Sequence, residues 1–200
     1  MPGALVSLAR RAIALLPASG LRQSYFTTFW LPREALTGAL SPIERLVAQL
    51  WPLAKPPAEC TGVEWWVGRA YTNALPIGFH FDQDVKARRS FRHPLLSSVF
   101  FFNRVRGGQL AVTDQVAGAR GQPVPPIAGA LDTVKPRRNR YVVFRGDRFH
   151  GVLDAAGRAP TGRARAPAGR LRITLVVNFW NRRPTSVPTF ARGERHHRNQ

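Results

Sequence analysis

Hydrophobic positions in the first fifty residues recur at the spacing of a helix. Apolar side chains between positions 4 and 16 can share one helical face, namely Val6, Leu8, Ile13 and Leu16. The segment Ser41-Pro42-Ile43-Glu44 is typical of a helix start, since it combines a capping serine with proline at the first helical position. Three prolines, Pro52, Pro56 and Pro57, are expected to end helical structure. We therefore expect residues 1–58 to form a helical support.

From Gly62 onward the pattern changes to short runs rich in Val, Ile, Phe, Tyr and Trp, separated by turn residues. Such runs predict strands. They cover residues 63–71, 77–82, 97–103, 109–114, 140–145, 149–153 and 171–180. Many short strands with Gly and Pro between them indicate a sandwich, barrel or jelly roll. Because the helices come first, we expect a mainly β domain with N-terminal helices packed on one sheet.

Two segments lack any pattern that could bury a face. Residues 155–169 consist almost entirely of Ala, Gly, Arg and Pro, which predicts an exposed, flexible loop. Residues 192–200 are polar and end the chain, so we expect a disordered tail.

Length and composition fit one globular domain over residues 1–200, with 44% hydrophobic residues. No run approaches the roughly 18 apolar residues of a membrane helix. Arg10 and Arg11 interrupt the apolar N-terminal segment, which argues against a signal peptide. Cys60 is the single cysteine, so an intramolecular disulfide is excluded. We expect a cytoplasmic protein without a membrane partner; its oligomeric state is left open.

The formal net charge of +19 makes nucleic acid or another anionic partner plausible. The arginines are nevertheless spread along the chain, so a nucleic-acid partner is the less favoured interpretation. The chain has only 11 carboxylates, and one that lies beside a histidine therefore stands out.

Candidate metal ligands occur in Gly78-Phe79-His80-Phe81-Asp82. Residues two apart in a strand point to the same side, so His80 and Asp82 would present an imidazole and a carboxylate together. A third ligand is available in His150, which follows a buried run and a turn. Two histidines and one carboxylate leave open positions on a metal, which is the arrangement of non-haem iron(II) oxygenases. His93, His196 and His197 are expected at the surface.

The run 170–180 alternates between apolar and polar positions. Arg172, Thr174 and Asn178 share one face, and an inward-facing arginine is costly unless a carboxylate meets it. A guanidinium binds a carboxylate bidentately, which a bound dicarboxylate would allow. Arg170 has the same strand parity and stays an alternative to Arg172.

The order His-x-Asp, distal His and Arg-x-Thr resembles the 2-oxoglutarate/iron(II) dioxygenase superfamily, and within it the prolyl-4-hydroxylase-like branch. Residues 98–103 and Gly107-Gly108-Gln109-Leu110 look like a strand pair of that branch, and the segment before His150 looks like its distal-histidine segment. The resemblance covers about residues 62–182, which would be the catalytic core. It implies a double-stranded β-helix, with Fe(II), 2-oxoglutarate and dioxygen as cofactor and cosubstrates.

The resemblance also implies roles for single residues. His80, Asp82 and His150 would bind iron, while Arg172 and Thr174 would bind 2-oxoglutarate, with Tyr71 nearby. Further pocket residues are expected to be Asn103, Gln109, Asp84 and Asn178. Residues 84–96 and 115–135 are expected to be loops that close over the iron and select the substrate.

Three functions are consistent with these residues. The favoured one is hydroxylation of an unidentified small molecule, peptide or protein; the arginines of 84–96 would suit an anionic substrate. The second is oxidative demethylation of nucleic acid by the same site. The third is a cupin-like module that binds a metal or ligand without turnover.

Overall fold

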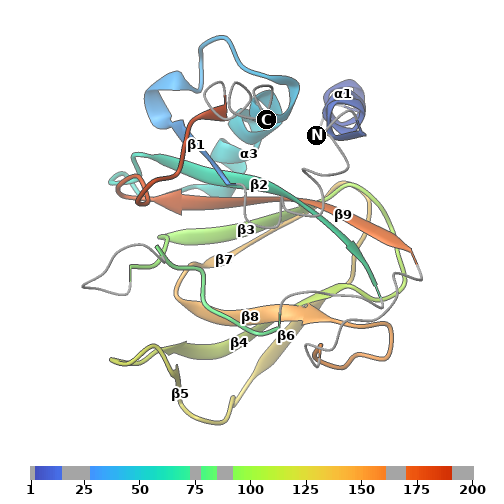
Figure 1. Ribbon diagram of the computed structural model, residues 1–200, viewed down its shortest axis with the longest axis vertical. Coiled ribbons are helices and arrows are strands. Elements are labelled where there is room, and N and C mark those ends of the chain that lie inside the picture. The colour runs from blue at the N-terminus through green and yellow to red at the C-terminus, as the bar shows by residue number, and fades with distance from the viewer. Residues whose placement is uncertain (1–2, 15–27, 73–77, 85–91, 161–169, 191–200) are drawn as a thin grey trace.

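The computed structural model describes residues 3–14, 28–72, 78–84, 92–160 and 170–190. Two antiparallel sheets face each other, and the helices cover the outer face of the larger one (Figure 1). Strands are the dominant element after residue 60, as the short Val-, Phe- and Trp-rich runs predict.

The larger sheet has five strands in the order β1-β2-β9-β3-β7. Their bounds are β1 Phe29–Pro32, β2 Gly62–Tyr71, β3 Leu96–Phe101, β7 Arg140–Arg145 and β9 Leu171–Trp180. β9 lies between β2 and β3, pairing along its whole length with β2. The strand that carries Arg172 is therefore central and held on both sides.

The smaller sheet has the order β5-β4-β6, with β8 pairing on β4 as well. Its strands are β4 Gln109–Ala117, β5 Pro123–Val124, β6 Leu131–Val134 and β8 Arg148–Leu153. His80 forms a bridge with His150 and so adds its segment beside β8. Leaving out β1 and β5, eight core segments can be numbered 1 to 8 in chain order: β2, the His80 segment, β3, β4, β6, β7, β8 and β9. In this numbering the larger sheet has the order 1-8-3-6 and the smaller sheet has the order 2-7-4-5. This is the double-stranded β-helix, and the predicted fold class is confirmed.

Among the described residues, two helices and one short 3₁₀ turn form the layer outside the larger sheet. They are α1 Gly3–Ala14, α3 Pro42–Ala54 and the 3₁₀ turn Arg33–Ala35. Ser41 and Glu44 form a capping box at the start of α3, each side chain accepting a hydrogen bond from the other's backbone N–H. The apolar faces of α1 and α3 pack on the outward side chains of β2 and β9, which gives the main core.

The alternation along β9 decides which residues face the interior between the sheets. Leu175, Val177 and Phe179 belong to the core under the helices. Val176 packs instead against Val99, Phe101 and Leu110 between the two sheets. Even-numbered positions of β9 therefore face the space between the sheets.

Several predicted boundaries are wrong. Residues 29–32 form an edge strand rather than a helix, because the backbone pairs with β2 while Trp30 and Leu31 become buried. α3 continues through Pro52 to Ala54. Proline removes a single helical hydrogen bond, and burial of Leu50 and Ala54 in the core outweighs that loss.

Two segments differ in kind from what the sequence predicts. Of the strand expected at 77–82, residues 78–82 contain a single bridge at His80, and residue 77 lies outside the described residues. The loop expected at 115–135 is sheet in part, because β4 runs on to Ala117 and is followed by β5 and β6. The backbone hydrogen-bonding groups of these short strands pair with β4. The sequence does not indicate these strands, because their residues are typical of turns.

The predicted flexible loop is described only up to residue 160. Asp154 organises its start: the carboxylate accepts hydrogen bonds from the backbone N–H groups of Ala156 and Arg158. Residues 161–169 and the predicted tail lie outside the described residues. No helix within the described parts of the chain is long and apolar enough to cross a membrane.

Candidate metal centre

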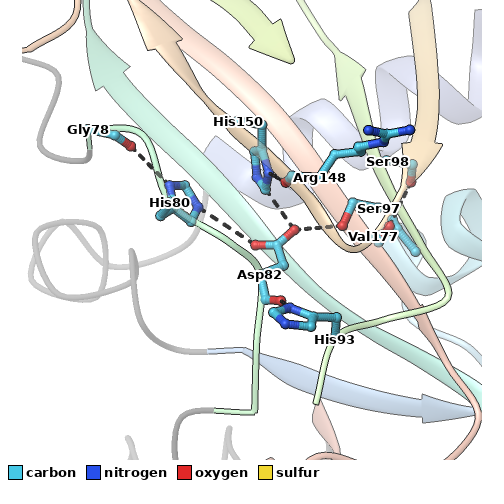
Figure 2. Close-up of polar contacts among 9 residues, drawn as sticks. All are labelled: Gly78, His80, Asp82, His93, Ser97, Ser98, Arg148, His150 and Val177. Atoms are coloured by element: carbon cyan, nitrogen blue, oxygen red, sulfur yellow. Dashed lines mark hydrogen bonds and ion pairs between the residues drawn. The ribbon is translucent and has the colours of Figure 1, made fainter. Parts of the chain in front are cut away.

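His80, Asp82 and His150 converge between the two sheets, and each offers one ligand atom within 4.8 Å of the others. Nε2 of His80 lies 3.7 Å from Oδ1 of Asp82, and Nε2 of His150 lies 3.6 Å from Oδ2. Figure 2 shows both imidazoles directed at this carboxylate. The backbone bridge between His80 and His150 explains the convergence of two segments seventy residues apart.

Each histidine is oriented by a backbone carbonyl two residues before it. Nδ1 of His80 lies 3.0 Å from the oxygen of Gly78, and Nδ1 of His150 lies 2.9 Å from the oxygen of Arg148. A carbonyl only accepts, so Nδ1 carries the proton and donates it. Nε2 of each ring then presents a lone pair toward the carboxylate, as a metal ligand requires.

Asp82 is fixed by two residues that the sequence did not single out as part of a site. Oγ of Ser97, at the start of β3, donates a 2.7 Å hydrogen bond to Oδ2 of Asp82. Nδ1 of His93 lies 2.7 Å from the backbone oxygen of Asp82 (Figure 2). His93 is half-buried here rather than a surface residue as expected, since its ring also packs on Phe81. Strand parity in 97–103 is the signal that could have revealed Ser97.

Burial and charge act in opposite directions on the three groups. Burial raises the pKa of Asp82, but the neighbouring His150 and His80 and the Ser97 hydroxyl outweigh it, so the pKa lies well below its usual range. Burial lowers the pKa of His150. Burial also lowers the pKa of His80, yet its hydrogen bond and attraction to Asp82 raise that pKa overall. The carboxylate is therefore ionised and His150 favours the neutral form, which is the state that binds a cation.

Arg172 is buried between the sheets, on the same inward face of β9 as Asn178. Its Nε donates to the backbone oxygen of Gly108 at 2.9 Å, and Nη1 lies 3.3 Å from Oγ1 of Thr174. The guanidinium carbon lies 5.2 Å from the centre of the Phe101 ring. These contacts hold the guanidinium in one orientation, while Arg170 is exposed at the strand end.

Thr174 and Asn178 lie with Arg172 on the inward face, as their parity predicts. Thr174 is fully buried and contacts Arg172. Asn178 is 2% exposed and pairs in register with Glu64 on one side and Ser97 on the other. Its Oδ1 has no hydrogen-bond partner among the described residues. The Oδ1 atom of Asn178 is therefore a buried hydrogen-bond acceptor on the strand next to Ser97. Ser97 in turn donates to Asp82.

The other expected pocket residues are not brought together with this site. Tyr71 pairs with Leu171 and lies on the opposite face from Arg172. Asn103 binds the backbone of Leu171 and Ile173 with its amide.

Gln109 and Asp84 are also engaged elsewhere. Gln109 neighbours Leu110, which packs between the sheets, so strand alternation turns Gln109 to the outer face. Asp84 accepts hydrogen bonds from Arg92 and from the backbone and hydroxyl of Thr185. Its carboxylate holds the end of the 78–84 segment to the residues after β9.

Glu64 is a further carboxyl on the inward face that the sequence did not reveal, because it lies in a mostly apolar strand. It pairs in register with Asn178 of β9. Burial is the main cause that raises its pKa; the charges of Asp82 and Asp84 also raise it and the Thr28 hydroxyl lowers it, and the resulting pKa is about 7. The interior between the sheets therefore contains a second carboxyl group, that of Glu64, which is more weakly acidic than that of Asp82.

The donor set fits a divalent transition metal. Two imidazole nitrogens and one carboxylate, each oriented by a neighbour, are the ligands that non-haem iron(II) sites use, and they leave other positions open. The hydrogen bonds from the Nδ1 atoms and from Ser97 are the outer contacts that fix such ligands.

No family model and no curated protein matches the chain. Among solved structures, a prolyl-4-hydroxylase from Pseudomonas putida is 18% identical, with a TM-score of 0.43 over 88% of this chain and 80% of that one. AviO1 from Streptomyces viridochromogenes is 15% identical, with a TM-score of 0.49 over 94% and 89%. HygX from Streptomyces hygroscopicus, with iron bound, is 13% identical, with a TM-score of 0.47 over 95% and 80%.

Proposed function

We propose that the chain is an Fe(II)- and 2-oxoglutarate-dependent dioxygenase that hydroxylates a small-molecule, peptide or protein substrate. The observation that carries the proposal is the convergence of His80, Asp82 and His150, with Nε2 of both rings facing the carboxylate. The buried, oriented guanidinium of Arg172 on the same interior supports it.

One set of residues would bind the metal and another would bind the cosubstrate. His80, Asp82 and His150 would hold Fe(II), with the carbonyls of Gly78 and Arg148 keeping the protons on Nδ1. Ser97 keeps Asp82 in one rotamer and favours its ionised form. Bound Fe(II), with 2-oxoglutarate and dioxygen, supplies the oxidising chemistry and yields succinate and carbon dioxide.

Arg172 and Thr174 would bind the distal carboxylate of 2-oxoglutarate. The guanidinium can form paired hydrogen bonds with a carboxylate, and Thr174 adds a hydroxyl donor beside it. Val99, Phe101 and Leu110 pack between the sheets on the same interior, and these apolar side chains would shield a bound carboxylate from water. The inward orientation of Arg172 favours an oxygenase over a cupin-like module that binds only a metal.

Turnover tests the proposal. Purified protein with Fe(II), ascorbate, 2-oxoglutarate and oxygen is expected to form succinate, even slowly and without a hydroxylated substrate. Asp82→Ala is expected to abolish it, whereas Asp147→Ala, which removes a carboxylate paired with Arg145 at the surface, is expected to retain it. Succinate formation that survives in Asp82→Ala would contradict the assignment of the metal site.

A further inference from the structure

Basic residues are concentrated in the loops at one end of the barrel. At this end, on the right in Figure 1, β2 and β3 finish and β7 and β9 begin. We call this set the basic end, and define it by its eight cationic residues. They are Arg104, Arg106, Lys135, Arg137, Arg138, Arg140, Arg158 and Arg170. In the same loops, 103–108, 135–140 and 153–158, Asp154 is the one carboxylate.

Contacts between the loops hold these cations on one surface. The backbone N–H of Asn139 donates to Phe101 at 2.9 Å, which ties the turn before β7 to the end of β3. The amide of Asn103 donates to the carbonyl of Leu171 at 2.7 Å, beside Arg170. A Cβ on Gly107 would lie 2.7 Å from Cα of Ala155, so the third loop is in contact as well.

Most of these cations form no ion pair among the residues that the structure describes. Asp154 pairs with Arg158, with 3.4 Å between Oδ2 and Nε. Arg104, Arg106 and Arg138 are exposed and form no ion pair with any carboxylate that the structure describes. Such a surface produces a strongly positive field that attracts polyanions.

An exposed aromatic ring lies at the same end. Tyr71 closes β2, is 40% exposed, and pairs in register with Leu171, next to Arg170. The backbone N–H of Thr72 donates to the carbonyl of Arg170 at 3.2 Å, which fixes this neighbourhood. An exposed ring at the same end of the barrel as several guanidinium groups is a combination on which an unpaired base stacks while its phosphates are neutralised.

We propose that the basic end binds single-stranded nucleic acid, with the arginines contacting phosphates and Tyr71 stacking on a base. Guanidinium groups bind phosphate oxygens bidentately, and stacking requires no particular base, so binding is expected to be largely independent of sequence. The proposal does not depend on the oxygenase activity, because none of these residues binds the metal.

A charge-reversal experiment tests the role of the arginines. Binding of a fluorescent single-stranded oligonucleotide of about twelve nucleotides is measured by anisotropy over a range of salt concentrations, without metal or 2-oxoglutarate. Arg137→Glu/Arg138→Glu is expected to weaken binding at least about tenfold and to lower the salt slope by about 1.4, the loss of two phosphate contacts. Arg10→Glu/Arg11→Glu, two exposed arginines on α1, makes the same change in net charge and is expected to have little effect. Equal effects of the two double variants would overturn the proposal.

A second variant separates nucleic acid from other polyanions. Tyr71→Leu is expected to weaken binding of the oligonucleotide about tenfold by loss of one stacking contact. The control Ile127→Ala removes an apolar side chain that is 84% exposed elsewhere and is expected to bind normally. If polyglutamate binds as tightly and Tyr71→Leu has no effect, an acidic protein replaces nucleic acid as the partner. If the arginine variant binds the oligonucleotide normally but raises the KM for 2-oxoglutarate in a separate turnover assay, the basic end serves the cosubstrate instead.

Discussion

Ser97 is the residue beside the candidate metal site whose removal most cleanly tests the geometry. Its hydroxyl donates to Asp82 at 2.7 Å, and Ser97→Ala would leave that oxygen free to rotate. We expect roughly a 10- to 100-fold loss of affinity for Mn(II), measured by calorimetry. Ser98→Ala is the matched control, because Ser98 points the other way and donates to Val177. Equal losses in the two variants would show that Ser97 does not act through Asp82.

Glu64 gives the folded protein a pH dependence that a glutamine would remove. Its pKa rises from 4.5 unfolded to about 7 folded, so the folded state holds this proton more tightly. Its contribution to stability is complete below pH 4.5 and is lost as the pH rises through 7. Glu64→Gln, which mimics the neutral carboxyl, should gain up to about 3 kcal/mol over the wild type at high pH.

Urea unfolding of the metal-free protein at pH 5 and pH 8 measures this difference. The advantage of Glu64→Gln in the free energy of unfolding is expected to be small at the lower pH and larger at the higher one. An advantage that is the same at both pH values would mean that Glu64 is not titrating in this range.

At the scale of elements, β9 shows what a sequence pattern can predict. Its strict alternation placed Arg172 and Asn178 on one face, and the structure buries both there. The segment of His80 has a similar pattern, yet residues 78–84 contain one bridge instead of a strand. Alternation reports which side chains share a face, but whether the backbone pairs depends on a partner, here His150, that is distant in sequence.

The pairing of β2 with β9 places Gly68 against the residues proposed to bind 2-oxoglutarate. Gly68 lies opposite Thr174, and an added Cβ would lie 2.7 Å from Oγ1 of Thr174. Gly68→Ala must displace this buried hydroxyl and disturb its contact with Arg172. We expect about a tenfold loss of affinity for 2-oxoglutarate, the value of one hydrogen bond, with unchanged Mn(II) affinity. Gly38→Ala, in the connection before α3, is the control, and a loss of metal affinity in Gly68→Ala would contradict this account.

For the molecule as a whole, the sequence indicated the fold class because its helices and strands are separated along the chain. It could not give the outer contacts of the site. Ser97 and His93 reach Asp82 only because β3 and the segment before it pack beside residues 78–84. Tyr71 was expected near 2-oxoglutarate from its position in the chain, whereas the register with Leu171 turns it to the other face. Register between distant strands depends on tertiary packing, which local patterns do not contain.

Metal binding should stabilise the whole fold, since the ligands come from two segments joined only by one bridge and side-chain contacts. At a free Mn(II) concentration of about 100 times Kd, the gain is about 2.7 kcal/mol. For a chain of this size that corresponds to a rise in Tm of about 5–10 °C. His150→Ala is expected to show no rise in a thermal scan, and His93→Ala, which removes a non-ligand histidine beside Asp82, is expected to keep most of it. An equal rise in His150→Ala would place the metal elsewhere.

The most direct test of the central claim is calorimetric titration of 2-oxoglutarate into the protein, without oxygen, in the presence and absence of Mn(II). The site of His80, Asp82, His150 and Arg172 predicts binding that requires the metal. It also predicts that Asp82→Ala and Arg172→Ala abolish binding, while Arg170→Ala, at the exposed end of the same strand, retains it. Failure of 2-oxoglutarate to bind the metal-loaded wild type, or binding that Arg172→Ala leaves intact, would contradict the claim.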